Sequence, residues 1–88
     1  MYTSIYSDEL TKKLEKLKKR EPKHYETVRK KIDWILENPD HDYKNLRHNL
    51  SGTSRVHIGH FVLIFVINNN QKTILFDDYD HHDKIYQN

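Results

Sequence analysis

The feature that most constrains the fold is a run of seven consecutive apolar residues, Phe61–Ile67, in an otherwise polar chain. The run is too short to cross a membrane as a helix, and it is rich in β-branched and aromatic residues, so it predicts a strand. Both of its alternating faces are apolar, and such a strand is stable only where protein covers each face. The sequence therefore predicts a central strand around which the rest of the chain packs.

Turn-forming residues flank this strand, with Gly59–His60 before it and Asn68–Gln71 after it. Beyond the turns lie two shorter segments with strand-forming residues, Ser54–Ile58 and Lys72–Asp77. We interpret the three segments as a three-stranded antiparallel meander. Tyr2–Tyr6 alternates in the way a half-buried strand does, and it is expected to join the same sheet.

Two amphipathic helices are predicted between the first strand and the meander. Ser7, followed by Asp8 and Glu9, is typical of a helix start, and leucines then recur at helical spacing. Pro22 suits the first turn of a second helix, which is expected to end at Asn38–Pro39. A link of three or four residues would join the two in an αα-hairpin that covers one face of the sheet.

The length of 88 residues is enough for one core, so we expect a single domain over residues 1–88. The order strand, helix, helix and meander predicts an α+β fold with its helices on one sheet face and the other face open. Residues 40–54 are expected to be a polar connection. The chain has no cysteine, no secretory leader pattern and no long apolar stretch, so disulfides, secretion and membrane insertion lack support and we expect a cytoplasmic protein.

Positive charge is concentrated in the first part of the chain. The formal net charge is only +2, yet residues 1–31 hold ten Lys and Arg against five Asp and Glu. Most basic runs of this kind are solvated helix faces, but such a run can also contact the phosphates of a nucleic acid without reading its sequence. The lysines of the first helix that we consider for RNA contact are Lys12, Lys13 and Lys16.

Strand alternation is expected to place Arg55 and His57 on one face of the sheet. If Val56 and Ile58 point toward the helices, the guanidinium and the imidazole point toward the open face. Taken alone, these two residues could be ordinary solvent-facing side chains of an antiparallel strand.

The segment Asp77–Tyr86 holds two adjacent histidines, four aspartates and two tyrosines. Histidine accepts and donates protons near neutral pH, so His81 and His82 could cleave a phosphodiester by acid–base chemistry. Arg55 and Arg47 would then balance the phosphoryl charge, and the 2′-OH of RNA would supply the nucleophile without a metal. A metal site is a further interpretation, disfavoured by the spacing. A polar tail that keeps the sheet edge soluble is another.

Several segments together resemble the RelE/ParE toxin superfamily of bacterial and archaeal toxin–antitoxin systems. The resemblance covers nearly the whole chain. Its most specific part is the connector Leu46–Gly52, which is closely similar to the YoeB branch. The other matching segments are Tyr2–Tyr6, Ile35–Pro39, Ser54–Gly59 and His81–Tyr86.

The resemblance implies a RelE-like fold and a ribosome-dependent mRNA endonuclease that a cognate antitoxin holds inactive. In that family a basic concave sheet surface engages mRNA in the ribosomal A site, and cleavage leaves a 2′,3′-cyclic phosphate without metal or cofactor. The residues expected to be catalytic are Arg47, Arg55, His81, His82 and Tyr86. The residues expected to contact RNA are Lys44, His48, His57, Lys12, Lys13 and Lys16.

Two positions depart from the family pattern. Val62 stands where active relatives usually carry an arginine, and Lys44 stands where the YoeB branch has a glutamate. His81 and His82 could take over the acid and base roles, in an order that the sequence leaves open, with His57 as a local replacement. The alternative function is that of a non-catalytic, ParE-like toxin that binds DNA gyrase. Either function implies an antitoxin, expected to lay a helical acidic segment across the apolar helix faces or the basic patch.

Overall fold

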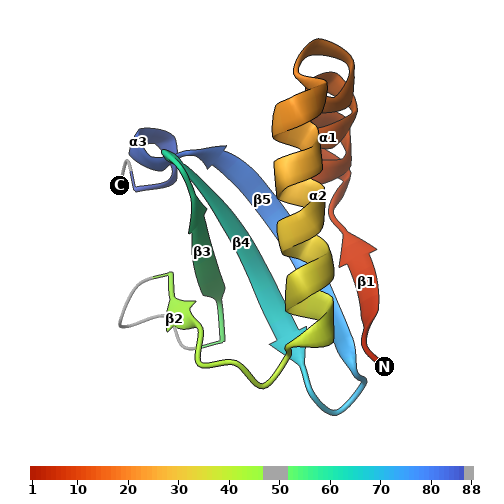
Figure 1. Cartoon of the computed structure of the whole chain (residues 1–88). Helices are drawn as coiled ribbons and strands as arrows, with labels where there is room; N and C mark the ends of the chain where they lie inside the picture. Colours follow the sequence, from red (N-terminus) through yellow and green to blue (C-terminus); the bar gives the residue numbers. More distant parts are fainter. Residues whose placement is uncertain (47–51, 87–88) are drawn as a thin grey trace.

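The computed structural model describes residues 1–46 and 52–86 and has a helical hairpin packed on one face of a five-stranded sheet (Figure 1). The strand order is β1-β5-β4-β3-β2, with β1 parallel to β5 and every other pair antiparallel. The predicted α+β architecture is confirmed. The elements are β1 (Thr3–Tyr6), α1 (Asp8–Arg20), α2 (Pro22–Glu37), β2 (Lys44–Asn45), β3 (Ser54–Ile58), β4 (Phe61–Asn68), β5 (Thr73–His81) and α3 (His82–Ile85).

The helix boundaries follow the signals in the sequence. The Ser7 hydroxyl accepts the backbone N–H of Leu10 at 3.0 Å, and α2 begins at Pro22, as predicted. The predicted link of three or four residues is wrong, because Glu21 alone separates α1 from α2, and its N–H still bonds the carbonyl of Leu17 at 2.8 Å. Within residues 1–46 and 52–86, no helix is long and apolar enough to cross a membrane.

Strand β4 is buried on both faces. Leu63 and Phe65 face the helices and join a core that includes Leu10, Val28, Ile32 and Ile35. On the opposite face, Val62 is 0% exposed and Ile64 is 7% exposed. The expectation that this second face is open is therefore wrong along β4. The short helix α3, at the end of the chain, lies against β4 and β5.

Three features at the sheet margins were not predicted. The polar connection contains β2, whose Lys44 and Asn45 pair with β3. Strand β5 continues to His81 and leads directly into α3. A bulge at Asp77 shifts the register, because Phe65 is paired with Phe76 whereas Ile64 is paired with Asp78. Beyond the bulge, Tyr79 turns into the core and the aspartates on either side of it turn to the opposite face.

The core position of Phe65 leads to a stability prediction. Phe65→Ala removes a fully buried ring that packs on Tyr43 and Phe76, so the free energy of unfolding should fall by about 3–5 kcal/mol in a urea titration. The control Ile5→Ala, at a 47% exposed position on the edge strand β1, should cost less than about 1 kcal/mol. Equal losses in the two variants would contradict the described core.

Candidate functional site

Arg55 projects from β3 on the sheet face opposite the helices. Its Nε donates to the backbone carbonyl of Asn45 in β2 at 2.9 Å, and its guanidinium carbon lies 5.9 Å from the centre of the Tyr86 ring. Lys44 is the direct cross-strand partner of Arg55, so the two side chains share this face. The bond through Nε positions the guanidinium and does not consume its terminal NH₂ donors, which suits the binding of an anion.

Two imidazoles lie next to this arginine. The ring centres of His57 and His82 are 5.8 Å apart, and the ring of His82 is 4.8 Å from that of Tyr86. His57 comes from β3, whereas His82 and Tyr86 come from α3 and the residue that follows it. We refer to Arg55, His57, His82 and Tyr86 as the histidine–arginine cluster. Contacts between its members link β3 to the end of the chain.

The surroundings of His57 in the cluster lower the pKa of its imidazole. Partial burial lowers the pKa of His57, and the nearby positive charges of Arg55 and His82 lower that pKa further. The imidazole of His57 is therefore mainly neutral at pH 7 and can accept a proton. The carboxylate of Asp83 lies 3.5 Å from Nδ1 of His82, close enough to orient that ring.

The histidine–arginine cluster combines a proton acceptor, a second imidazole and a guanidinium on one accessible surface. These groups suit proton transfer at a phosphodiester together with neutralisation of its phosphoryl oxygens. Among the residues that the structure describes, none pairs with the buried hydroxyl of Tyr86. Within the same described ranges, no three His, Asp or Glu side chains form a group able to hold a metal ion.

His81 does not join the cluster. It is the cross-strand partner of Phe61, which packs against the core, and its ring lies 5.5 Å from that of Phe61 and 6.3 Å from that of His60. Its Nδ1 accepts the N–H of Asp83 at 3.2 Å and caps α3. The sequence led us to expect both C-terminal imidazoles beside Arg55. The structure places His82 in the cluster, next to His57 and Tyr86, whereas His81 lies outside it.

The remaining predicted site residues lie in different surroundings. Lys12 and Lys16 are exposed on α1, in the helix layer and away from the cluster. Lys13 is held by Asp78 and Asp80 of β5. Two further predicted residues, Arg47 and His48, lie outside the described residues.

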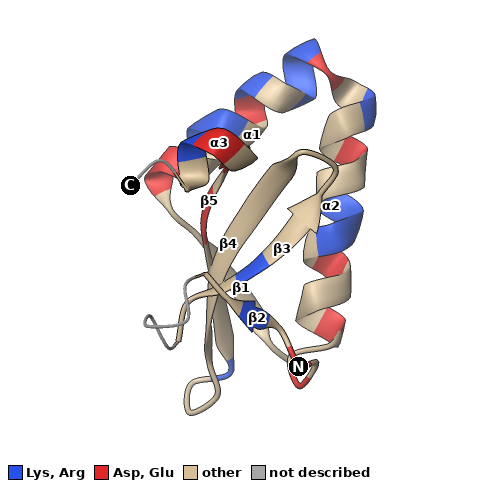
Figure 2. Ribbon diagram, turned by 90° about the vertical axis from the view of Figure 1, so that its left-hand side faces the viewer, with Lys and Arg blue, Asp and Glu red and all other residues tan. Residues whose placement is uncertain are grey.

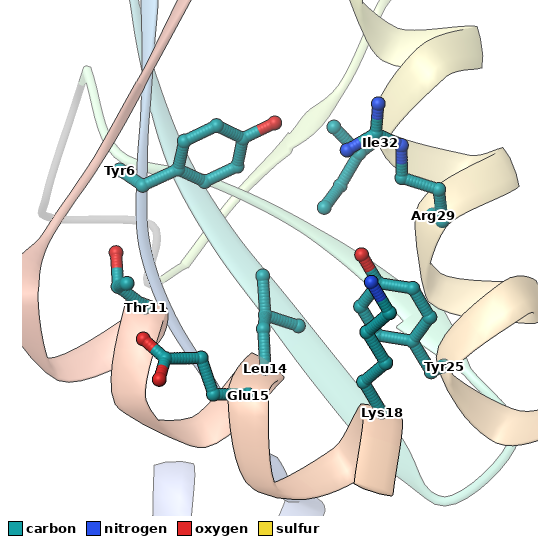
Figure 3. A pocket seen from close by; sticks show the side chains of 8 residues that line it. All are labelled: Tyr6, Thr11, Leu14, Glu15, Lys18, Tyr25, Arg29 and Ile32. Atoms are coloured by element: carbon teal, nitrogen blue, oxygen red, sulfur yellow. The ribbon is translucent and has the colours of Figure 1, made fainter. Parts of the chain in front are cut away.

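A second surface feature is a groove of about 250 Å³ between the hairpin and β1 (Figure 3). Its apolar lining comes from Tyr6, Leu14, Tyr25 and Ile32. The polar residues around it are Thr11, Glu15, Lys18 and Arg29. The helical spacing of the apolar residues is visible in the sequence, but the groove is not, because Tyr6 reaches it from a strand that the sheet places beside the helices.

Comparison with known proteins gives a consistent result. Residues 5–86 match the family model described as "ParE toxin of type II toxin-antitoxin system, parDE". A protein of Methanocaldococcus jannaschii named "Putative toxin RelE4" is 48% identical over 88 residues, which cover 99% of this chain and 93% of that protein.

Solved structures share the fold. The toxin–antitoxin complex RelBE2 of Mycobacterium tuberculosis contains a chain that is 25% identical, with a TM-score of 0.73 and coverage of 91% of this chain and 96% of that one. The isolated RelE toxin of E. coli is 14% identical, with a TM-score of 0.77 and coverage of 92% and 84%. The latter likeness concerns the fold alone.

The electrostatic coupling in the cluster can be measured by NMR titration of the imidazoles. Arg55→Gln removes one of the positive charges that lower the pKa of His57, so that pKa should rise toward the ordinary value of about 6.5. The control Arg29→Gln, on α2 and paired with Asp33, should leave the titration of His57 unchanged. An unchanged or lower His57 pKa in Arg55→Gln would rule out the described coupling.

Proposed function

The chain belongs to the ParE toxin family, within the RelE/ParE toxin superfamily, and is a toxin of a toxin–antitoxin system; on this premise we propose that it cleaves mRNA on the ribosome. The observation that carries the proposal is the convergence of Arg55, His57, His82 and Tyr86 on the helix-free face of the sheet. The cleavage uses the 2′-OH of the RNA as its nucleophile and takes place in the cytoplasm, where ribosomes translate.

Each member of the histidine–arginine cluster has a role in this reaction. His57, which is mainly neutral, accepts the proton of the 2′-OH while the 2′-oxygen forms a bond to phosphorus. His82 donates a proton to the 5′-oxygen as the bond between that oxygen and phosphorus breaks, which leaves a 2′,3′-cyclic phosphate. Arg55, with Lys44 beside it, stabilises the charge on the phosphoryl oxygens. Tyr86 contacts both Arg55 and His82 and holds them against the substrate.

The buried position of Val62 is compatible with this assignment. Val62 is 0% exposed and lies between its cross-strand partners His57 and Asp80. A charged side chain would be costly in such a place unless it were paired. In this chain the positive charge at the proposed site therefore comes from Arg55 in the cluster and from its cross-strand neighbour Lys44 in β2.

A second candidate function is inhibition of DNA gyrase by direct binding. The observation that favours it is that the matching family model is the one described for ParE toxins. The two candidates predict different damage in the cell, because cleavage cuts translated messages whereas gyrase inhibition leaves them intact and alters DNA supercoiling.

The cognate antitoxin is proposed to occupy the groove of the hairpin. The RelBE2 structure is a toxin–antitoxin complex, which supports a protein partner of this kind. The groove offers an apolar floor with Lys18 and Arg29 at its rim, and the ammonium of Lys18 lies 5.7 Å from the centre of the Tyr25 ring. An amphipathic helix with acidic residues along its edge fits this combination.

Primer-extension mapping of mRNA from cells that express the toxin tests the proposed cleavage. His57→Ala and His82→Ala should each reduce cleavage within translated codons by about 10²–10⁴-fold, because each removes a proton-transfer group. His60→Ala is the control and should retain most activity, since His60 is exposed, its side chain is not part of the cluster, and its backbone carbonyl, which accepts the N–H of His82, is kept.

Equal cleavage by wild type, His57→Ala and His82→Ala would contradict the assigned roles. Intact messages together with altered plasmid supercoiling in wild-type cells would favour gyrase inhibition.

Titration calorimetry with the antitoxin encoded beside the toxin tests the proposed groove. The double change Lys18→Glu and Arg29→Glu places like charge against the acidic edge of the helix and should weaken binding by at least about tenfold. The matched double change Lys19→Glu and Lys30→Glu reverses two exposed lysines of the same helices that do not line the groove, and it should have a smaller effect. A larger effect in this control would place the antitoxin elsewhere.

A further inference from the structure

Lys13 of α1 reaches the far end of β5. Its Nζ donates to Oδ1 of Asp78 at 2.7 Å and to Oδ2 of Asp80 at 2.9 Å, and a carboxylate oxygen of Glu9 lies 3.8 Å away. The side chains of Lys13, Asp78 and Asp80 are only 31%, 26% and 26% exposed. We refer to these three residues as the Lys13 bridge.

The contacts within the Lys13 bridge favour the charged forms of Lys13 and Asp80. Burial opposes the charge on Lys13, but its hydrogen bonds with Asp78 and Asp80 outweigh that effect and raise its pKa. Burial likewise opposes the charge on Asp80, yet the hydrogen bond from Lys13, a backbone N–H and the charge of Lys84 lower its pKa. One ammonium therefore cancels half of the charge of two carboxylates.

The two aspartates share a sheet face with the histidine–arginine cluster. In one row across the sheet, Arg55 is paired with Ile64 and Ile64 with Asp78. Directly opposed residues of antiparallel strands point to the same side. Figure 2 shows the basic segments of β2 and β3 and the acidic segment of β5 on different strands of this sheet.

The next row places Asp80 two strands away from His57, with Val62 between them. Two strand spacings are roughly 10 Å, which is close to the Debye length of about 8 Å at physiological salt. Uncancelled carboxylates at this distance would act both on the imidazole and on a bound polyanion.

We infer that Lys13 does not contact RNA but screens the site from the negative charge of Asp78 and Asp80. The part of this inference that concerns RNA rests on the proposed function. The ammonium has three donors, and Asp78 and Asp80 take two of them. If Lys13 turned to a phosphate, it would leave two partly buried carboxylates without their cation, next to the same phosphate. Lys13 therefore differs in role from Lys12, its exposed neighbour on α1, with which the sequence grouped it.

The experiment compares Lys13→Met, the triple variant Lys13→Met, Asp78→Asn and Asp80→Asn, and the control Lys12→Met. NMR titration at low salt reports the pKa of His57, and fluorescence anisotropy reports binding of a labelled single-stranded RNA carrying 2′-deoxyribose. Lys13→Met should raise the His57 pKa and weaken RNA binding roughly two- to fivefold, because it uncovers two negative charges. The triple variant replaces a bridge of net charge −1 by a neutral one, so it should reverse both changes and bring the His57 pKa and the RNA affinity back to the wild-type values or slightly past them. Lys12→Met should leave the His57 pKa unchanged.

The variants separate the two ways in which the inference can fail. A triple variant that binds RNA as weakly as Lys13→Met would show that Lys13 itself contacts phosphate. An unmoved His57 pKa in Lys13→Met would show that there is no screening, while leaving the proposed cleavage intact. If the His57 pKa changes as expected in the variants but the wild-type protein does not bind RNA, the screening role of Lys13 would stand and the proposed function would be contradicted. If Lys13→Met fails to fold, the triple variant, which has no uncompensated carboxylate, still decides through its RNA affinity.

Discussion

The rest of the structure depends on the need to cover strand β4 on both faces. Its residues Leu63 and Phe65 are buried under the helical hairpin, while Val62 and Ile64 are buried on the other side. An all-apolar strand cannot leave one face in water without a large loss of hydrophobic stabilisation. The second face is flanked by side chains of β3 and β5 and approached by α3, since no second helical layer exists among the described residues.

This way of covering β4 also assembles the candidate site. Arg55 and His57 lie beside Ile64 and Val62, their partners on β4. The segment that contains α3 places His82 and Tyr86 next to them from the end of the chain. Val62 and Ile64 also separate Arg55 and His57 from Asp80 and Asp78 of β5. The ammonium of Lys13 offsets part of the negative charge of these two aspartates. The packing of β4, the candidate site and its charge balance thus depend on the same surface.

Much of this arrangement could be predicted from the sequence, because it follows from local rules. The apolar run predicted β4, the residues Ser7 and Pro22 predicted the helix starts, and alternation around Val56 predicted the common face of Arg55 and His57. The separation of His81 from His82 depends on where β5 ends, and the bulge at Asp77 sets which residues of that strand face the core. The partners of Lys13 lie 65 and 67 residues away along the chain, so only the folded structure distinguishes this lysine from its exposed neighbours.

The proposed function requires that Arg55, His57 and His82 bind one phosphate on the helix-free face of the sheet. The most direct test is a crystal structure of the toxin with a short RNA in which 2′-deoxyribose at the cleavage position prevents reaction. We expect a phosphate within hydrogen-bonding distance of the Arg55 guanidinium and of both imidazoles. A phosphate bound along the lysines of α1, with Arg55, His57 and His82 making no contact to the RNA, would contradict the proposed function.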